Sequence, residues 1–213
     1  ILDLISDKFV NLKNLGSEVV RQDILDKYIN EVMLQASPCI NPMKIVVDCG
    51  NGSASEIAPK LIRSLGHQVT ELFCKIDGNF PNHHPDPGKN ENLQDLIKTV
   101  KSESADLGLA FDGDGDRLGV VSSNGEIIYP DQLMMIFSKE VLKNNQGKEI
   151  VFDVKCTNLL NKIISDAGGI PMISPTGHFH IKNILKKTKA PLAGEMSGHI
   201  FFNDQWYGFD DAH

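Results

Sequence analysis

Short apolar runs and helically spaced apolar residues alternate along the first half of the chain. Residues 45–47 are Ile-Val-Val, a run typical of a buried strand, and they lead into a glycine-containing loop at 48–52. A helix is predicted over 54–65, with Gly66 just past its end, and a second strand over 69–73. This order of strand, helix and strand predicts a β-α-β unit.

The pattern downstream predicts a loop, a helix and further strands. Prolines mark residues 79–90 as a loop, after which apolar residues at helical spacing predict a helix over 93–100. The next strand is predicted over 107–111. Asn124-Gly125 lies between two apolar runs, and this arrangement predicts a β-hairpin.

The second half repeats the pattern of the first. Pro130 suits the first turn of a helix that would end near Leu142, and residues 150–153 then resemble residues 45–48. Each of these two similar runs is followed by a helix that ends at glycine, at nearly the same spacing. The repeat predicts two structurally similar α/β units, joined around residues 120–130.

Composition places the chain among globular proteins. Hydrophobic residues make up 41% and charged residues 23%, which excludes a disordered tail, a collagen-like fibre and a membrane protein. The net charge of -7 opposes binding to nucleic acid or to acidic lipid, so neither is expected as a partner. No apolar stretch approaches the ~20 residues that cross a bilayer. The cysteines form no Cys-x-x-Cys pair, and we expect a reduced, cytoplasmic protein.

The strongest chemical signal is an acidic loop after the predicted strand 107–111. Asp112, Asp114 and Asp116 alternate with glycines, which let the backbone turn tightly while the carboxylates point the same way. Such oxygen ligands suit Mg²⁺, which keeps open positions for water or a phosphate oxygen. Arg117 adds a planar donor fork for phosphate, so the set points to phosphoryl transfer.

The residues of this loop fit three other interpretations to different degrees. An acidic surface turn is disfavoured, because three neighbouring like charges repel one another unless a cation lies among them. An EF-hand fails, because counting from Asp112 places Arg117 where Gly is required and Ser123 where Glu is required. A phosphatase with Asp112 as nucleophile stays open, because a strand-terminal aspartate beside Mg²⁺ suits phosphoaspartyl chemistry.

Three further polar segments contain candidate binding residues. Residues 194–199, after a strand-like run, offer a carboxylate, a hydroxyl and an imidazole suited to reading sugar hydroxyls. Residues 176–178 open a predicted helix, whose N-terminus favours anions, with Lys182 nearby. Lys155 follows the strand ending at Asp153, where α/β sheets place ligand-binding loops. Each of these features alone also fits an ordinary solvated segment.

Six sequence strings together resemble the α-D-phosphohexomutase superfamily, and within it bacterial phosphomannomutase/phosphoglucomutase. The strings are VVDCGNG at 46–52, DGNFPNHHPDPGK at 77–89, LAFDGDGDR at 109–117, DVKCTN at 153–158, TGH at 176–178 and GEMSGH at 194–199. The resemblance implies two similar three-layer α/β/α domains with mixed sheets. Residues 1–121 would hold the end of an interdomain helix and the family's second domain. Residues 122–213 would hold the third domain, truncated at its C-terminus.

The resemblance also implies a reaction and a role for each candidate residue. A phosphoserine enzyme would interconvert hexose 1-phosphate and hexose 6-phosphate, of mannose or glucose, through hexose 1,6-bisphosphate. Asp112, Asp114 and Asp116 would hold Mg²⁺, and Arg117 would contact the transferred phosphoryl group. The residues that would face the sugar, its phosphate or the proton being moved are Lys155, His178, Glu195, Met196, Ser197, Gly198 and His199. Arg117, His178 and His199 would have catalytic roles.

The chain departs from the family pattern in what it lacks. The family's phosphorylated serine lies in a Ser-His-Asn-Pro context in the first domain, and no Ser-His pair occurs in these 213 residues. The fourth domain would begin beyond His213, and Phe179 stands where a small polar residue is expected. The chain also starts without methionine, inside an amphipathic pattern of Leu2, Ile5 and Phe9. We therefore expect a mutase fragment that is inactive alone; the alternatives are a Mg²⁺-dependent sugar phosphatase and a non-catalytic sugar-phosphate binding module.

Overall fold

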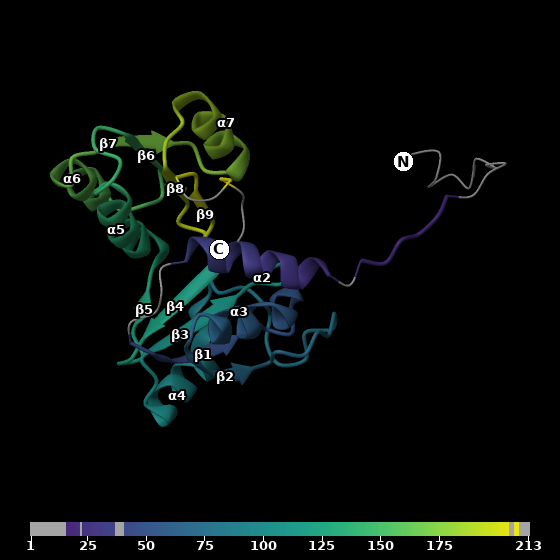
Figure 1. Cartoon of the computed structure of the whole chain (residues 1–213). Coiled ribbons are helices and arrows are strands. Elements are labelled where there is room, and N and C mark those ends of the chain that lie inside the picture. The colour runs from purple at the N-terminus through teal and green to yellow at the C-terminus, as the bar shows by residue number, and fades with distance from the viewer. Residues whose placement is uncertain (1–15, 22, 37–40, 205–206, 209–213) are drawn as a thin grey trace, which may run out of the picture.

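The computed structural model contains two α/β domains that follow each other along the chain (Figure 1). The residues that it describes are 16–21, 23–36, 41–204 and 207–208. The amphipathic pattern at the start of the chain lies outside them. Within the described ranges, no helix is long and apolar enough to cross a membrane.

The first domain is built on a mixed five-stranded sheet, sheet A. In spatial order its strands are β2 (Gln68–Leu72), β1 (Lys44–Asp48), β3 (Leu107–Phe111), β4 (Leu118–Ser122) and β5 (Ile127–Ile128). β1 is parallel to β2 and β3, whereas β4 is antiparallel to both of its neighbours. The predicted β-α-β unit and the hairpin at Asn124-Gly125 are confirmed.

Helices cover both faces of sheet A, because successive side chains of a strand point to opposite faces. The helices of this domain are α2 (Ile24–Gln35), the 3₁₀ helix η1 (Ser53–Glu56), α3 (Ala58–Ser64), the 3₁₀ helix η2 (Asn90–Leu93) and α4 (Gln94–Glu103). Ile45 and Val47 of β1 pack in one core with residues of η1 and α3. Val46 packs in a second core with residues of η2 and α4.

The second domain repeats this arrangement on a mixed four-stranded sheet, sheet B. In spatial order its strands are β7 (Ile170–Ser174), β6 (Glu149–Asp153), β8 (Leu192–Gly194) and β9 (Ile200–Phe202). Helices α5 (Pro130–Val141) and α6 (Leu159–Asp166) contribute to the core on one face, and α7 (His178–Thr188) to the core on the other. The first four strands of the two sheets follow the same order and directions. Two similar three-layer domains with mixed sheets are thus confirmed.

The structure differs from the sequence-based expectation in a few elements. The helix predicted over 54–65 is divided into η1 and α3, because Pro59 lacks an N–H and fits only in the first turn of a helix. The pattern also predicts neither α2 nor β7 nor β9. The domain boundary after Val121 stays a prediction; sheet A itself continues to Ile128.

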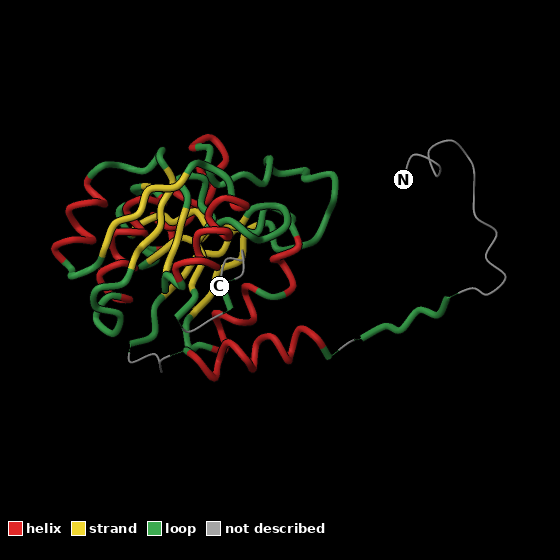
Figure 2. The backbone as a smooth tube through the Cα atoms, turned by 90° about the horizontal axis from the view of Figure 1, so that it is seen from above, coloured by secondary structure: helices red, strands yellow, loops and turns green. Residues whose placement is uncertain are grey.

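The two domains share part of their apolar core. Leu107, Leu109 and Leu118 of sheet A pack against the core that includes η1 and α3. The same three side chains also pack against the core that α5 and α6 form with sheet B, and Val120 is a buried member of that second core. In a view from above, the helices surround the strands of the molecule (Figure 2). Burial of these leucines fixes β3 and β4 beside the second domain.

Candidate metal and substrate site

The acidic loop connects the antiparallel strands β3 and β4, where Phe111 pairs with Leu118. Gly115 has a φ of +81°, a left-handed conformation that glycine adopts at little cost. Asp112 is buried, Asp116 is half-buried and Asp114 is exposed, yet ligand oxygens of all three lie within 4.8 Å of one another. The donor set therefore fits one hard divalent cation, which would also relieve the repulsion among the carboxylates.

Arg117 is held between two carboxylates at one side of this loop. Its Nε donates to Asp112 Oδ2 at 2.7 Å, and its Nη1 donates to Asp86 Oδ1 at 2.9 Å. Asp112 Oδ1 accepts the backbone N–H groups of Gly115, Asp116 and Arg117 at 3.0, 3.0 and 3.1 Å. Burial lowers the pKa of Arg117, but the two carboxylates outweigh burial, so the net pKa is raised. A fixed positive charge thus lies beside the acidic loop.

The loop at residues 195–199 joins β8 to β9, the position in sheet B that the acidic loop occupies in sheet A. Glu195 is 3% exposed, and Ser197 Oγ donates to its Oε2 at 3.3 Å. Among the described residues, Glu195 Oε1 has no hydrogen-bond partner. An unpaired buried carboxylate oxygen is costly, so this atom is suited to accept a hydrogen bond from a ligand.

The two loops meet at the junction of the domains. Leu118 N donates to Gly198 O at 3.4 Å, and a Cβ on Gly198 would lie 3.4 Å from Arg117 Cβ. His199 Nδ1 is 3.6 Å from Asp116 Oδ2. The rings of His199 and His178 are in edge-to-face contact, with centroids 6.0 Å apart. The structure therefore brings the predicted metal ligands, Arg117 and the two histidines into one region.

The remaining predicted residues lie at the same edge of sheet B. Because β6, β7 and β8 are parallel, the loops that follow them leave the sheet on one side. Lys155 follows β6 and is exposed, and His178 is the exposed first residue of α7, after β7. Met196 follows β8, and its backbone N–H donates to Asp153 Oδ1 at 3.2 Å. The binding roles of Lys155, His178 and Met196 stay predictions.

One buried aspartate in each domain organises the loops at the end of its sheet, and neither was predicted as a site residue. Asp153, at the end of β6, has no exposed surface and accepts hydrogen bonds from Met196 N, Thr176 Oγ1 and Cys156 Sγ. It thereby ties together the loops after β6, β7 and β8. Asp48 ends β1 at the equivalent place and accepts bonds from Gly50 N at 2.8 Å and His83 Nε2 at 3.1 Å. Burial raises the pKa of Asp48. The hydrogen bonds from Gly50 and His83 oppose this effect without cancelling it, so the net pKa is raised.

Truncating Asp153 is expected to destabilise the second domain. Asp153→Ala removes the acceptor of three hydrogen bonds and leaves buried donors unpaired, which should lower the free energy of unfolding by about 2–5 kcal/mol. Urea unfolding followed by circular dichroism measures the change. Asp166→Ala is the matched control, because Asp166 is an exposed partner of Lys162 on α6; equal losses in the two variants would contradict the role of Asp153.

The loop after β1 lies directly against the acidic loop. Ser53 N donates to Gly113 O at 3.0 Å. A Cβ on Gly52 would lie 2.7 Å from Gly113 O and 2.9 Å from Asp112 O, both backbone atoms. Only glycine permits this approach without a backbone shift.

Gly52→Ala is therefore expected to disturb the acidic loop and to cost about 1–3 kcal/mol of stability through overpacking. Thermal unfolding monitored by circular dichroism measures the loss. Gly78→Ala is the control, because a Cβ on Gly78 would meet no atom within 4 Å. A Gly52→Ala protein as stable as the Gly78→Ala protein would show that the close approach is unimportant.

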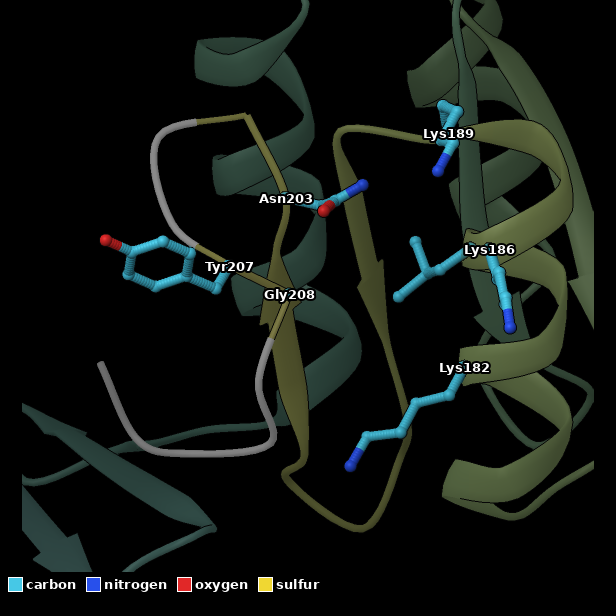
Figure 3. Close-up of a pocket in the computed structure, with 7 residues that line it drawn as sticks. Lys182, Lys186, Lys189, Asn203, Tyr207 and Gly208 are labelled. Atoms are coloured by element: carbon cyan, nitrogen blue, oxygen red, sulfur yellow. The ribbon is translucent and has the colours of Figure 1, made fainter.

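A separate hollow of about 310 Å³ lies between α7 and the segment after β9 (Figure 3). Its lining includes Lys182 and Lys186 of α7 and Lys189 just after that helix, with Asn203 and Tyr207 opposite. Lys182 Nζ lies 5.6 Å from the centroid of the buried Phe201 ring. Lys182 therefore extends along the α7 face of sheet B.

Comparisons with known proteins place both domains in one family. A model described as phosphoglucomutase/phosphomannomutase, alpha/beta/alpha domain II, matches residues 26–125. The model for alpha/beta/alpha domain III of the same family matches residues 129–213.

Longer relatives are named phosphomannomutase/phosphoglucomutase or phosphoglucomutase. The chain is 58% identical over 194 residues to a phosphomannomutase/phosphoglucomutase of Pseudomonas aeruginosa, covering 91% of this chain and 42% of that protein. It is 52% identical over 206 residues to a phosphoglucomutase of Neisseria meningitidis, covering 97% of this chain and 44% of that protein. A crystal structure of a phosphoglucomutase/phosphomannomutase family protein from Burkholderia thailandensis superposes with a TM-score of 0.86 at 53% identity. That match covers 88% of this chain and 41% of the other. The chain thus spans less than half the length of these relatives.

Proposed function

The chain belongs to the phosphoglucomutase/phosphomannomutase family, and we propose that its two domains supply the metal loop and the sugar-reading loop of a phosphohexomutase. The enzyme would interconvert hexose 1-phosphate and hexose 6-phosphate, of mannose or glucose, through a hexose 1,6-bisphosphate. The phosphoserine would come from another domain of the same protein, because these 213 residues contain no Ser-His pair. The cytoplasmic location expected from the cysteine spacing stays part of the proposal.

The contact between the two loops is the observation that carries this proposal. Asp116 of the acidic loop and His199 of the second loop are 3.6 Å apart. A ligand at this junction can therefore meet anionic metal ligands, a guanidinium and sugar-reading groups at once. Holding the reacting groups in one place supplies much of the rate enhancement in phosphoryl transfer.

In this proposal the acidic loop binds Mg²⁺ through Asp112, Asp114 and Asp116. When bound, the ion neutralises charge on the phosphoryl group. Arg117 donates two of its N–H groups to Asp112 and Asp86, and the rest remain for phosphate oxygens. The carboxylates fix the direction of the guanidinium before any substrate binds.

The second loop would read the sugar. Glu195 Oε1 would accept a hydrogen bond from a sugar hydroxyl, and the Ser197 hydroxyl would add a second contact. Met196 and Gly198 would shape the loop through their backbone contacts to Asp153 and Leu118. Lys155 and His178, at the ends of β6 and β7, would face the phosphate that is not being transferred.

His199 would move the proton of the reacting hydroxyl. A neutral imidazole can take this proton as the hydroxyl oxygen attacks phosphorus, and can return it in the reverse direction. Its Nδ1 lies near Asp116, which would stabilise the imidazolium that forms. His178, in ring contact with His199, would help to position it.

A phosphatase acting through Asp112 is less well supported. A nucleophilic carboxylate needs an oxygen free to attack phosphorus. Both oxygens of Asp112 are engaged, Oδ1 by three backbone N–H groups and Oδ2 by Arg117, and the side chain is 2% exposed. Asp112 is therefore suited to organise the loop and not to attack phosphorus.

The test is a mutase assay on the complete gene product that contains this chain. Glucose 1-phosphate, Mg²⁺ and a trace of glucose 1,6-bisphosphate should give glucose 6-phosphate, whereas the 213 residues alone should give none. Release of inorganic phosphate without isomerisation would favour a phosphatase. Ligand binding by calorimetry without either reaction would favour a binding module.

A further inference from the structure

Two cysteine thiols lie against each other in the first domain, outside the metal loop and the sugar-reading loop. Cys49 follows β1 and Cys74 follows β2, and their Sγ atoms are 3.2 Å apart. Cys49 has no exposed surface, whereas Cys74 is partly exposed and its thiol is also 3.2 Å from Leu72 O. β1 and β2 lie side by side in Figure 1.

The ends of two adjacent parallel strands bring this pair together. Asp48 pairs with Leu72 at the end of the parallel strands, and Cys49 N donates to Leu72 O at 3.1 Å beyond them. The two sulfurs need to approach by only about 1.2 Å to reach a bond of about 2.05 Å. Rotation of the two side chains can supply part of that movement, and a shift of the backbone around Cys49 supplies the rest.

We propose that Cys49 and Cys74 form an oxidation site, which hydroperoxides convert to a disulfide that disturbs the neighbouring acidic loop. In the first step the Cys74 thiolate attacks a peroxide oxygen, the O–O bond breaks, and Cys74 becomes a sulfenic acid while hydroxide leaves. The Cys49 sulfur then attacks the Cys74 sulfur, the S–O bond breaks, and the hydroxyl leaves as water with the proton of the Cys49 thiol. Overall two thiols and one hydrogen peroxide give one disulfide and two waters, the thiols losing two electrons to the peroxide.

The environment of each thiol fits its step. Cys74 is the accessible member, and a hydrogen bond with Cys49 lowers the pKa of Cys74, outweighing burial and Glu71, which raise it. The same hydrogen bond and burial raise the pKa of Cys49. Oxidation of Cys74 removes the largest cause of the raised pKa of Cys49, and the 3.2 Å contact then places Cys49 to close the disulfide before further oxidation.

The pair is connected to the proposed metal site through residues 49–53. Gly52 N donates to Cys49 O at 2.7 Å, and Ser53 N donates to Gly113 O at 3.0 Å. Gly52 lies against the backbone of Asp112 and Gly113 with no room for a Cβ. A shift of Cys49 toward Cys74 is therefore expected to move this segment against the acidic loop and weaken Mg²⁺ binding. This second effect rests on the proposed metal site, whereas disulfide formation does not.

Peptide mapping of the 213-residue chain tests the oxidation site. The chain carries Cys39→Ser, is treated with a small excess of hydrogen peroxide, alkylated under denaturing conditions and digested. Most of the protein should contain a Cys49–Cys74 cross-link that dithiothreitol removes. Cys156 is the internal control, because it is buried against Asp153 and burial raises the pKa of its thiol. Cys49→Ser should instead leave a sulfenic acid at Cys74 that a cyclic diketone traps. Full alkylation of both cysteines, or equal oxidation of Cys156, would overturn the proposal.

Calorimetric titration with Mg²⁺ before and after oxidation tests the coupling. The dissociation constant should rise about fivefold or more, and a Cys49→Ser/Cys74→Ser double variant should show no change with peroxide. Equal binding to both forms would overturn the coupling and leave the oxidation site standing. Binding to neither form would count against the proposed metal site instead.

Discussion

Replacing Asp114 with asparagine is expected to abolish mutase turnover of the complete protein, with a loss in kcat of at least about 1,000-fold. Asp114 is the exposed member of the acidic trio, whereas Asp112 is buried and holds the loop together. Asparagine keeps the size of the side chain but removes one negative charge from the ligand set. The loss should therefore come from weaker cation binding, and the fold should persist.

Two measurements separate these effects for Asp114→Asn. Calorimetry with Mg²⁺ on the 213-residue chain should show a much weaker interaction than the unmodified chain, and circular dichroism should be unchanged. Asp166→Asn is the control, because Asp166 is an exposed carboxylate paired with Lys162. A variant at position 114 that kept both the original rate and the original Mg²⁺ affinity would remove the metal assignment.

Glu195→Gln is expected to lower kcat/KM by about 10- to 150-fold. The buried Oε1 would accept a sugar hydroxyl in the proposed complex, and hydrogen bonds to a charged group contribute about 1.5–3 kcal/mol each. Glutamine has nearly the same shape but replaces one acceptor oxygen with a donor. The loss follows because about 1.4 kcal/mol corresponds to a factor of ten in rate.

Steady-state kinetics on the complete protein measure the effect of Glu195→Gln. Glu140→Gln serves as its control, because Glu140 is an exposed partner of Lys143 on α5. Thermal unfolding should place both variants close to the unmodified protein. If Glu195→Gln and Glu140→Gln reacted equally fast, Glu195 would have no part in sugar recognition.

The elements that could be predicted from sequence are those whose pattern depends on local packing. The strand at 107–111 was predicted with its observed bounds, because an apolar run lies between a polar helix end and a glycine-rich loop. The elements that were missed depend on tertiary context. β7 tolerates Pro171 because it pairs on one side only, and β9 has only three residues.

The candidate site also contains residues that a local sequence pattern predicts and residues that only the fold reveals. The acidic loop was found because like charges at alternating positions have few structural uses other than cation binding. Asp48, Asp86 and Asp153 were missed as site residues, because a single acidic residue carries no pattern and its burial depends on the fold. A signal did exist for Asp48 and Asp153, because an aspartate directly after an apolar run recurs in both halves of the chain. Such a residue is predicted to be buried, and a buried carboxylate needs several donors.

The leucines shared by the two cores determine when the site is assembled. Leu107, Leu109 and Leu118 are packed on both sides, so β3 and β4 are held against the second domain once the chain has folded. The loss of freedom needed to bring Asp116 beside His199 therefore occurs during folding. Ligand binding need not include that entropic cost, which makes the junction a preorganised receptor for its ligand.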